Sequence, residues 1–170
     1  MRKIAKRIVI GLGLLVILLS LFIRPFPFQG YYEGFVRHRL IASEINGALR
    51  VTAIEHTEIH DVIDNWDQYQ EKILQTKVLS ANEIQKLLEA IPAAEDGSDN
   101  SFLSCGFYPH HRIEIERQDH SVFVWEICFT CGEHQLPNDR NRILPEGWET
   151  SLASFFKGIG MDPEIHKRKL

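Results

Sequence analysis

Alternation of apolar and polar residues between positions 112 and 129 constrains the fold of this chain more than any other feature. Ile113 and Ile115 alternate with charged residues in the first half. In the second half, four apolar residues would share one face of an extended chain: Phe123, Trp125, Ile127 and Phe129. Successive side chains of a strand point to opposite faces, so the pattern predicts a β-hairpin with one face against a core.

The register of this hairpin follows from matching its two apolar faces. A two-residue turn at Asp119-His120 would place Trp125 beside Glu114, which separates the isoleucines from the aromatic face. A three-residue loop over 118–120 instead places Ile115 opposite Phe123 and Ile113 opposite Trp125. We therefore expect the three-residue loop. The same ladder, extended, places His111 opposite Ile127 on the core face and His110 opposite Cys128 on the polar face.

The rest of the chain supplies helices and two more strands. Helical spacing begins at Tyr31 and ends near Gly47, and residues 49–56 and 72–79 have strand character, with Leu74, Thr76 and Val78 facing inward. Residues 57–72 between the strands read as a short helix or an ordered loop. We predict an α+β fold: a small antiparallel sheet that includes the hairpin 111–129, packed by about three helices, after an N-terminal transmembrane helix.

Two of the predicted helices have recognisable starts. Ser80 and Glu83 form a capping box, and the helix that follows buries Ile84, Leu87, Leu88 and Ile91 before Pro92. Residues 132–147 read as a long polar connection. A closing helix capped by Thr150 then buries four residues at helical spacing, which are Leu152, Phe155, Phe156 and Ile159.

The first 24 residues predict a membrane anchor. Four basic residues precede an uncharged apolar run from Ile8 to Ile23, about 24 Å long as a helix. A cleaved signal peptide is the rival interpretation. No small-x-small cleavage site follows Ser20, so we favour an uncleaved single-pass anchor in the inner membrane. The positive-inside rule places the basic end in the cytoplasm and the remaining chain outside it, facing the periplasm.

Length and charge indicate how the chain is divided and what its exported part can bind. We expect an anchor over 1–24, a juxtamembrane linker over 25–30, a single α+β domain over 31–160 and a basic tail over 161–170. Five of the 19 basic residues lie in the anchor, which leaves 14 against 23 acidic residues, a net charge of about −9. Such an acidic domain repels phosphate backbones, so we expect no nucleic-acid partner.

A cluster of cysteines and histidines surrounds the hairpin, and four interpretations of it remain open. Cys105, Cys128 and Cys131 with His110 or His111 match a Cys₃His zinc site. Alternatively, Cys105 forms a structural disulfide with Cys128 or Cys131, as the oxidising exterior favours. Cys128 and Cys131 also form a C-x-x-C pair, the spacing of redox motifs, although it follows a strand rather than opening a helix. Inert buried thiols are the fourth interpretation.

The same residues carry a resemblance. The pattern C-x-x-x-P-x-H, a hairpin and then I-C-F-x-C, formed here by Cys105, Pro109, His111, Cys128 and Cys131, resembles a group of small uncharacterised bacterial proteins. Proteins of that group are often membrane-anchored or exported. The resemblance implies no activity, and in its pattern the site histidine is His111, whereas the predicted register favours His110.

Size, acidity and the anchor favour a binding protein over an enzyme. No catalytic residues stand out, because the other histidines and carboxylates have spacings common on solvated surfaces. We expect a membrane-anchored, periplasm-facing domain that binds another protein, of the immunity or accessory type, with the Cys/His cluster as a disulfide or a zinc site. The alternative is a thiol-redox or metal-dependent enzyme that uses Cys128 and Cys131.

Overall fold

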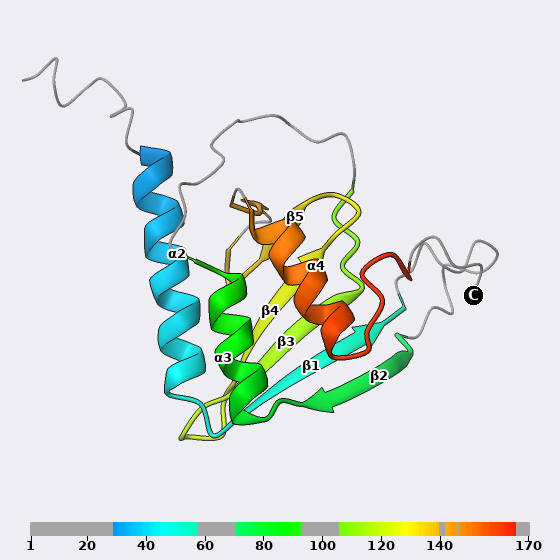
Figure 1. The fold of residues 1–170 in the computed structure, drawn as a ribbon. Helices are drawn as coiled ribbons and strands as arrows, with labels where there is room; N and C mark the ends of the chain where they lie inside the picture. The colour runs from blue at the N-terminus through cyan, green and yellow to red at the C-terminus, as the bar shows by residue number, and fades with distance from the viewer. Residues whose placement is uncertain (1–28, 58–70, 93–105, 140–141, 146, 166–170) are drawn as a thin grey trace, which may run out of the picture.

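The computed structural model describes residues 29–57, 71–92, 106–139, 142–145 and 147–165 (Figure 1). Three helices and six strands lie in these ranges. In chain order they are α2 (Gln29–Asn46), β1 (Arg50–His56), β2 (Ile73–Val78), α3 (Ala81–Ala90), β3 (His111–Glu116), β4 (Val122–Cys128), β5 (Glu133–Gln135), β6 (Arg142–Ile143) and α4 (Trp148–Gly158).

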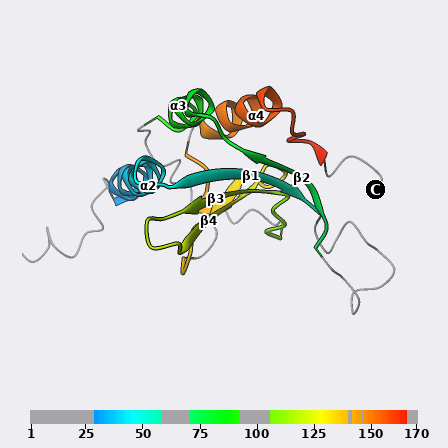
Figure 2. The ribbon, with the colours of Figure 1, turned by 90° about the horizontal axis from the view of Figure 1, so that it is seen from below.

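The six strands form one sheet in the order β2-β1-β3-β4-β5-β6, and every neighbouring pair is antiparallel. Helices α2, α3 and α4 lie side by side on one face of this sheet (Figures 1 and 2). The predicted α+β class, the antiparallel sheet and the number of helices are confirmed.

The predicted anchor lies outside the described residues, and within the described ranges no helix is long and apolar enough to span a bilayer.

The hairpin β3–β4 has the predicted register. Ile113 pairs with Trp125 and Ile115 with Phe123, and the loop between the strands holds three residues. His120 ends that loop with φ 63°, the left-handed conformation expected at the last position of such a turn. The carboxylate of Asp119 accepts hydrogen bonds from the amide (3.0 Å) and the hydroxyl (2.7 Å) of Ser121, which closes the loop.

The core lies between the helices and the near face of the sheet. The fully buried side chains Ile113, Ile115, Trp125 and Ile127 of β3 and β4 line that face. Helices α3 and α4 pack on them mainly through Leu87, Leu152 and Phe156, all without exposed surface, and α2 adds Ile41 and Ile45. Burying side chains of this size stabilises the fold by roughly 1.5–3 kcal/mol each.

Both predicted helix starts can be compared with the structure. The capping box is confirmed: the Ser80 amide donates to the Glu83 carboxylate at 2.9 Å, and the Glu83 amide donates to the Ser80 hydroxyl at 3.4 Å. The ammonium of Lys77 and the Ser80 groups lower the pKa of Glu83 to about 2. Thr150 was the wrong cap for the closing helix, which begins earlier, after Gly147 with φ 81°.

Trp148 explains the early start of α4. Its indole N–H donates to the Pro92 carbonyl at 2.9 Å, and its amide donates to the Pro145 carbonyl at 3.0 Å. The ring is fully buried and meets Trp125 edge-on, with centroids 6.1 Å apart. Tertiary contacts of this one side chain therefore set the helix boundary, and sequence spacing alone does not contain them.

Two further predictions were wrong in detail. The predicted polar connection after the hairpin contains the short strands β5 and β6, which add to the sheet next to β4. Strand β2 exists, but Val78 is 57% exposed and Thr76 is exposed, because both lie on the face of the sheet away from the helices. Its helix-side residues are Gln75 and Lys77, which pair with Glu55 and Ala53 of β1.

Candidate functional site at the Cys/His end of the hairpin

The predicted site residues gather where β3 begins and β4 ends. His111 pairs with Ile127, as predicted, and this is the last pair of the β3–β4 ladder. Cys128 pairs with Glu133 of β5, and Cys131 lies in the turn between β4 and β5. Cys105 lies outside the described residues. The fold therefore brings both histidines and two of the three cysteines to one end of the sheet.

His111 is a core residue. Its side chain is 1% exposed, and its ring meets Phe129 and Phe156 edge-on, with centroids 5.2 and 4.9 Å away. Among the residues that the structure describes, neither ring nitrogen has a side-chain hydrogen-bond partner. Burial, followed by the charges of His110 and His56, lowers the pKa of His111 to about 3, although Asp162 acts in the opposite direction. The imidazole is therefore neutral at pH 7.

Glu55 is a site residue that the sequence analysis missed. It follows Val51 and Ala53 on the core face of β1, and it is buried. Its carboxylate accepts a hydrogen bond from the Asp162 amide at 2.7 Å, and the same oxygen lies 3.9 Å from Nε2 of His111. The alternation of β1 places the Glu55 side chain on the core face, and a buried carboxylate needs a hydrogen-bond donor. Glu55 thus holds the segment after α4 against the sheet.

His56 and His110 complete a group of three histidines at this end of the sheet. The His56 amide donates to the His110 carbonyl at 2.9 Å, so both residues belong to the β1–β3 side of the site. Nδ1 of His56 lies 3.1 Å from its neighbour's carbonyl at Thr57 and 3.5 Å from a Glu71 carboxylate oxygen. Among the described residues, no three His, Cys, Asp or Glu side chains are arranged to hold a metal ion.

His134 is the second buried histidine that sequence reasoning missed. The Trp125 indole N–H donates to Nδ1 of His134 at 3.1 Å, while Nε2 is buried with no partner in the described part of the chain. Burial, followed by the charge of Arg37, lowers the pKa of His134 to about 3. Because Nδ1 accepts a hydrogen bond, the ring is the neutral tautomer with its hydrogen on Nε2. The residue was overlooked because the sequence predicted a loop where β5 lies.

The two described cysteines have different chemical states. Cys128 is a buried free thiol. Burial raises its pKa, against the opposing effect of the backbone amides of Tyr108, Cys131 and Thr130 near its sulfur. Cys131 is disulfide-bonded, and its sulfur lies 3.1 Å from the Gly106 carbonyl oxygen. Gly132, which follows with φ 62°, gives the turn a conformation that favours glycine.

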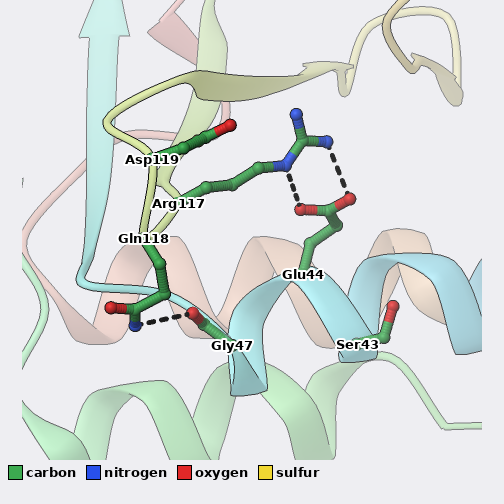
Figure 3. A pocket seen from close by; sticks show the side chains of 6 residues that line it. All are labelled: Ser43, Glu44, Gly47, Arg117, Gln118 and Asp119. Atoms are coloured by element: carbon green, nitrogen blue, oxygen red, sulfur yellow. Dashed lines mark hydrogen bonds and ion pairs between the residues drawn. The ribbon is translucent and has the colours of Figure 1, made fainter.

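A shallow pocket of about 330 Å³ lies at the hairpin tip, at the other end of β3 (Figure 3). Its lining residues are Ser43, Glu44, Gly47, Arg117, Gln118 and Asp119. Arg117 binds the Glu44 carboxylate with two hydrogen bonds of 2.7 Å, which raise the pKa of the guanidinium. Gln118 donates to the Gly47 carbonyl at 3.2 Å. These contacts join the hairpin tip to the end of α2.

Comparisons with protein-family models, with curated proteins and with solved structures find no match to this chain.

Proposed function

We propose that this chain is a membrane-anchored, exported domain that binds another protein, and that its Cys/His end has a structural role. The observation that carries the proposal is the chemical state of that end. His111 and His134 are neutral core residues, and the Cys128 thiol is buried with a raised pKa. Groups that would act as bases, nucleophiles or ligands are instead packed as parts of the core.

The structural role centres on a disulfide. Cys131 is bonded and Cys128 is free, and the chain has three cysteines in all. We propose Cys105 as the partner of Cys131 within one chain. Such a bond joins the segment before β3 to the turn after β4. Disulfides persist in oxidising compartments such as the periplasm, so this pairing fits the predicted export of the domain.

A second role is worth testing because of the amides around Cys128. The amides of Thr130 and Cys131, which follow Cys128 in the chain, stabilise its thiolate form, as does the amide of Tyr108. An amide-lined cysteine three residues before another cysteine is the arrangement of zinc knuckles and redox pairs. The alternative function, for a form in which the Cys131 bond is reduced, is a thiol-redox or metal-dependent enzyme that uses Cys128 and Cys131.

Export predicts a defined result in a protease experiment. Protease added to intact spheroplasts should digest the domain beyond Pro25 and leave a small membrane-embedded fragment that contains the first 24 residues. A cytoplasmic protein in the same preparation serves as the control and should stay intact until the membrane is permeabilised. Full protection of the domain in intact spheroplasts would show that the orientation is reversed.

A further inference from the structure

The end of α2 carries a chemically reactive pair of residues. Asn46 is the last residue of the helix, Gly47 follows it, and both are exposed. The sequence contains no other asparagine followed by glycine. Asparagine is a thermolabile residue, and a glycine after it leaves the next backbone nitrogen unhindered, so that this nitrogen can attack the side-chain amide. The pair is therefore a place where the chain can lose ammonia without an enzyme.

The reaction at such a pair is deamidation through a cyclic imide. The Gly47 nitrogen attacks Cγ of Asn46, a bond forms between these atoms, and the bond from Cγ to Nδ2 breaks. Nδ2 leaves as ammonia and takes the proton of the Gly47 amide with it. Water then opens the imide at one carbonyl or the other, which leaves aspartate or isoaspartate at position 46. Water is the only co-reactant.

The last turn of α2 opposes this reaction in the folded chain. The Gly47 amide donates to the Ser43 carbonyl at 3.1 Å, which continues the hydrogen-bond pattern of the helix. A nitrogen that keeps this bond points along the helix and cannot attack the Asn46 side chain. The Gly47 carbonyl is held as well, because it accepts a hydrogen bond from the Gln118 side chain at 3.2 Å. The last turn must therefore open before the reaction can begin.

We propose that Asn46 is a deamidation site of this protein, and that the contacts between α2 and the hairpin tip set its rate. These contacts are the two hydrogen bonds from Arg117 to Glu44 and the one from Gln118 to Gly47 (Figure 3). Helix ends fray, and contacts from another element reduce the population of the frayed state. When opening and closing are fast, the rate of the reaction follows that population.

The products alter the same end of the helix. Both have a carboxylate at position 46, where the negative end of the helix macrodipole and the neighbouring Glu44 disfavour it. Isoaspartate also adds one carbon to the main chain before Gly47, whose amide and carbonyl are both bonded in the folded state. Deamidation therefore loosens the contact between α2 and the hairpin tip.

Peptide mass spectrometry of the full chain, incubated in detergent at pH 8, measures the rate at Asn46. Gln118→Ala removes the bond to Gly47 from an exposed side chain, so the core is unchanged. Deamidation at Asn46 should become about fivefold faster, the change in population for the loss of one ordinary hydrogen bond. Gln85→Ala is the matched control, because it removes an exposed glutamine that bonds Glu89 within α3. It should leave the rate at Asn46 unchanged.

A second variant tests the attacking nitrogen. Gly47→Ala adds a methyl group 3.4 Å from the Ser43 carbonyl oxygen, a van der Waals contact, so the helix keeps its end. The methyl group shields the nitrogen, and deamidation at Asn46 should be lost. Asn82, an exposed residue of α3, reports general loosening of the fold in each sample.

Three results would overturn the proposal. The first is an equal rate at Asn46 in the original protein and in Gln118→Ala. The second is an equal acceleration at Asn82 in that variant, because loosening of the whole fold would then set the rate. The third is undiminished deamidation in Gly47→Ala, because the Gly47 nitrogen would then not be the attacking group.

Discussion

Lowering the pH from 7 to 5 should reduce the free energy of unfolding by about 4 kcal/mol, because two buried histidines must stay neutral in the folded state. The folded pKa is about 3 for both His111 and His134, against an ordinary value of 6.5. Between these values the unfolded chain binds more protons than the folded chain. Each histidine then loses about 1.4 kcal/mol of stability for every pH unit.

The sign and range of this effect follow from the depressed pKa. The stability contribution is fully present above about pH 6.5, falls as the pH drops and is exhausted near pH 3. The charged and titratable groups near His111 are Glu55, His56, His110 and Asp162, and those near His134 are Arg37, Asp139 and Arg142. Of these groups, only the carboxylates favour protonation of the histidines, and burial outweighs their effect at both rings. Urea denaturation of the purified protein between pH 7.5 and 5 measures the slope.

His111→Phe is the sharpest control for this prediction. The His111 ring packs between Phe129 and Phe156, and its nitrogens have no side-chain hydrogen-bond partner among the described residues, so phenylalanine can replace it with its main packing contacts kept. The variant should lose about half of the pH dependence between pH 7 and 5. The prediction fails if the variant and the original protein have the same slope.

Loss of the disulfide should be the second large effect. If Cys131 is joined to Cys105, the bond closes a loop of roughly 26 residues, and the chain-entropy model assigns such a loop about 3–4 kcal/mol. Cys131→Ser should lower the free energy of unfolding by that amount. Denaturation of the variant and the original protein, each at pH 7.5, gives the difference directly.

Cys128→Ala is the matched control, because it removes a cysteine of the same C-x-x-C pair without breaking the disulfide. The thiol is small and buried, so its removal should cost about 1 kcal/mol. Reductant should destabilise the original protein and this variant equally and leave Cys131→Ser unchanged. Equal losses in Cys128→Ala and Cys131→Ser would argue for a shared role of both sulfurs.

The hairpin could be predicted from sequence because one local rule decides it. Only one register places Ile113 and Ile115 on the aromatic face, and this preference also fixes the three-residue loop and the pairing of His111 with Ile127. The capping box at Ser80 and the buried face of α4 were equally local. In these elements, neighbours in sequence carry the information that determines the structure.

The missed features depend on distant contacts. Residues Glu133–Gln135 have no strand periodicity of their own, yet they add to β4 as β5, where His134 accepts a hydrogen bond from the Trp125 indole N–H. Strand β2 alternates like a buried strand but lies at the edge of the sheet. Glu55 is recognisable as a buried acid only once its strand is known to face α4 and the segment after it.

The most direct test of the structural role of the Cys/His end is a count of free thiols. Protein prepared from its native compartment is alkylated under denaturing conditions, with and without a chelator, and analysed by mass spectrometry. The account predicts one alkylated residue, Cys128, a linked pair of peptides that contain Cys105 and Cys131, and no effect of the chelator. Three alkylated cysteines, or thiols that become accessible only with chelator, would contradict it.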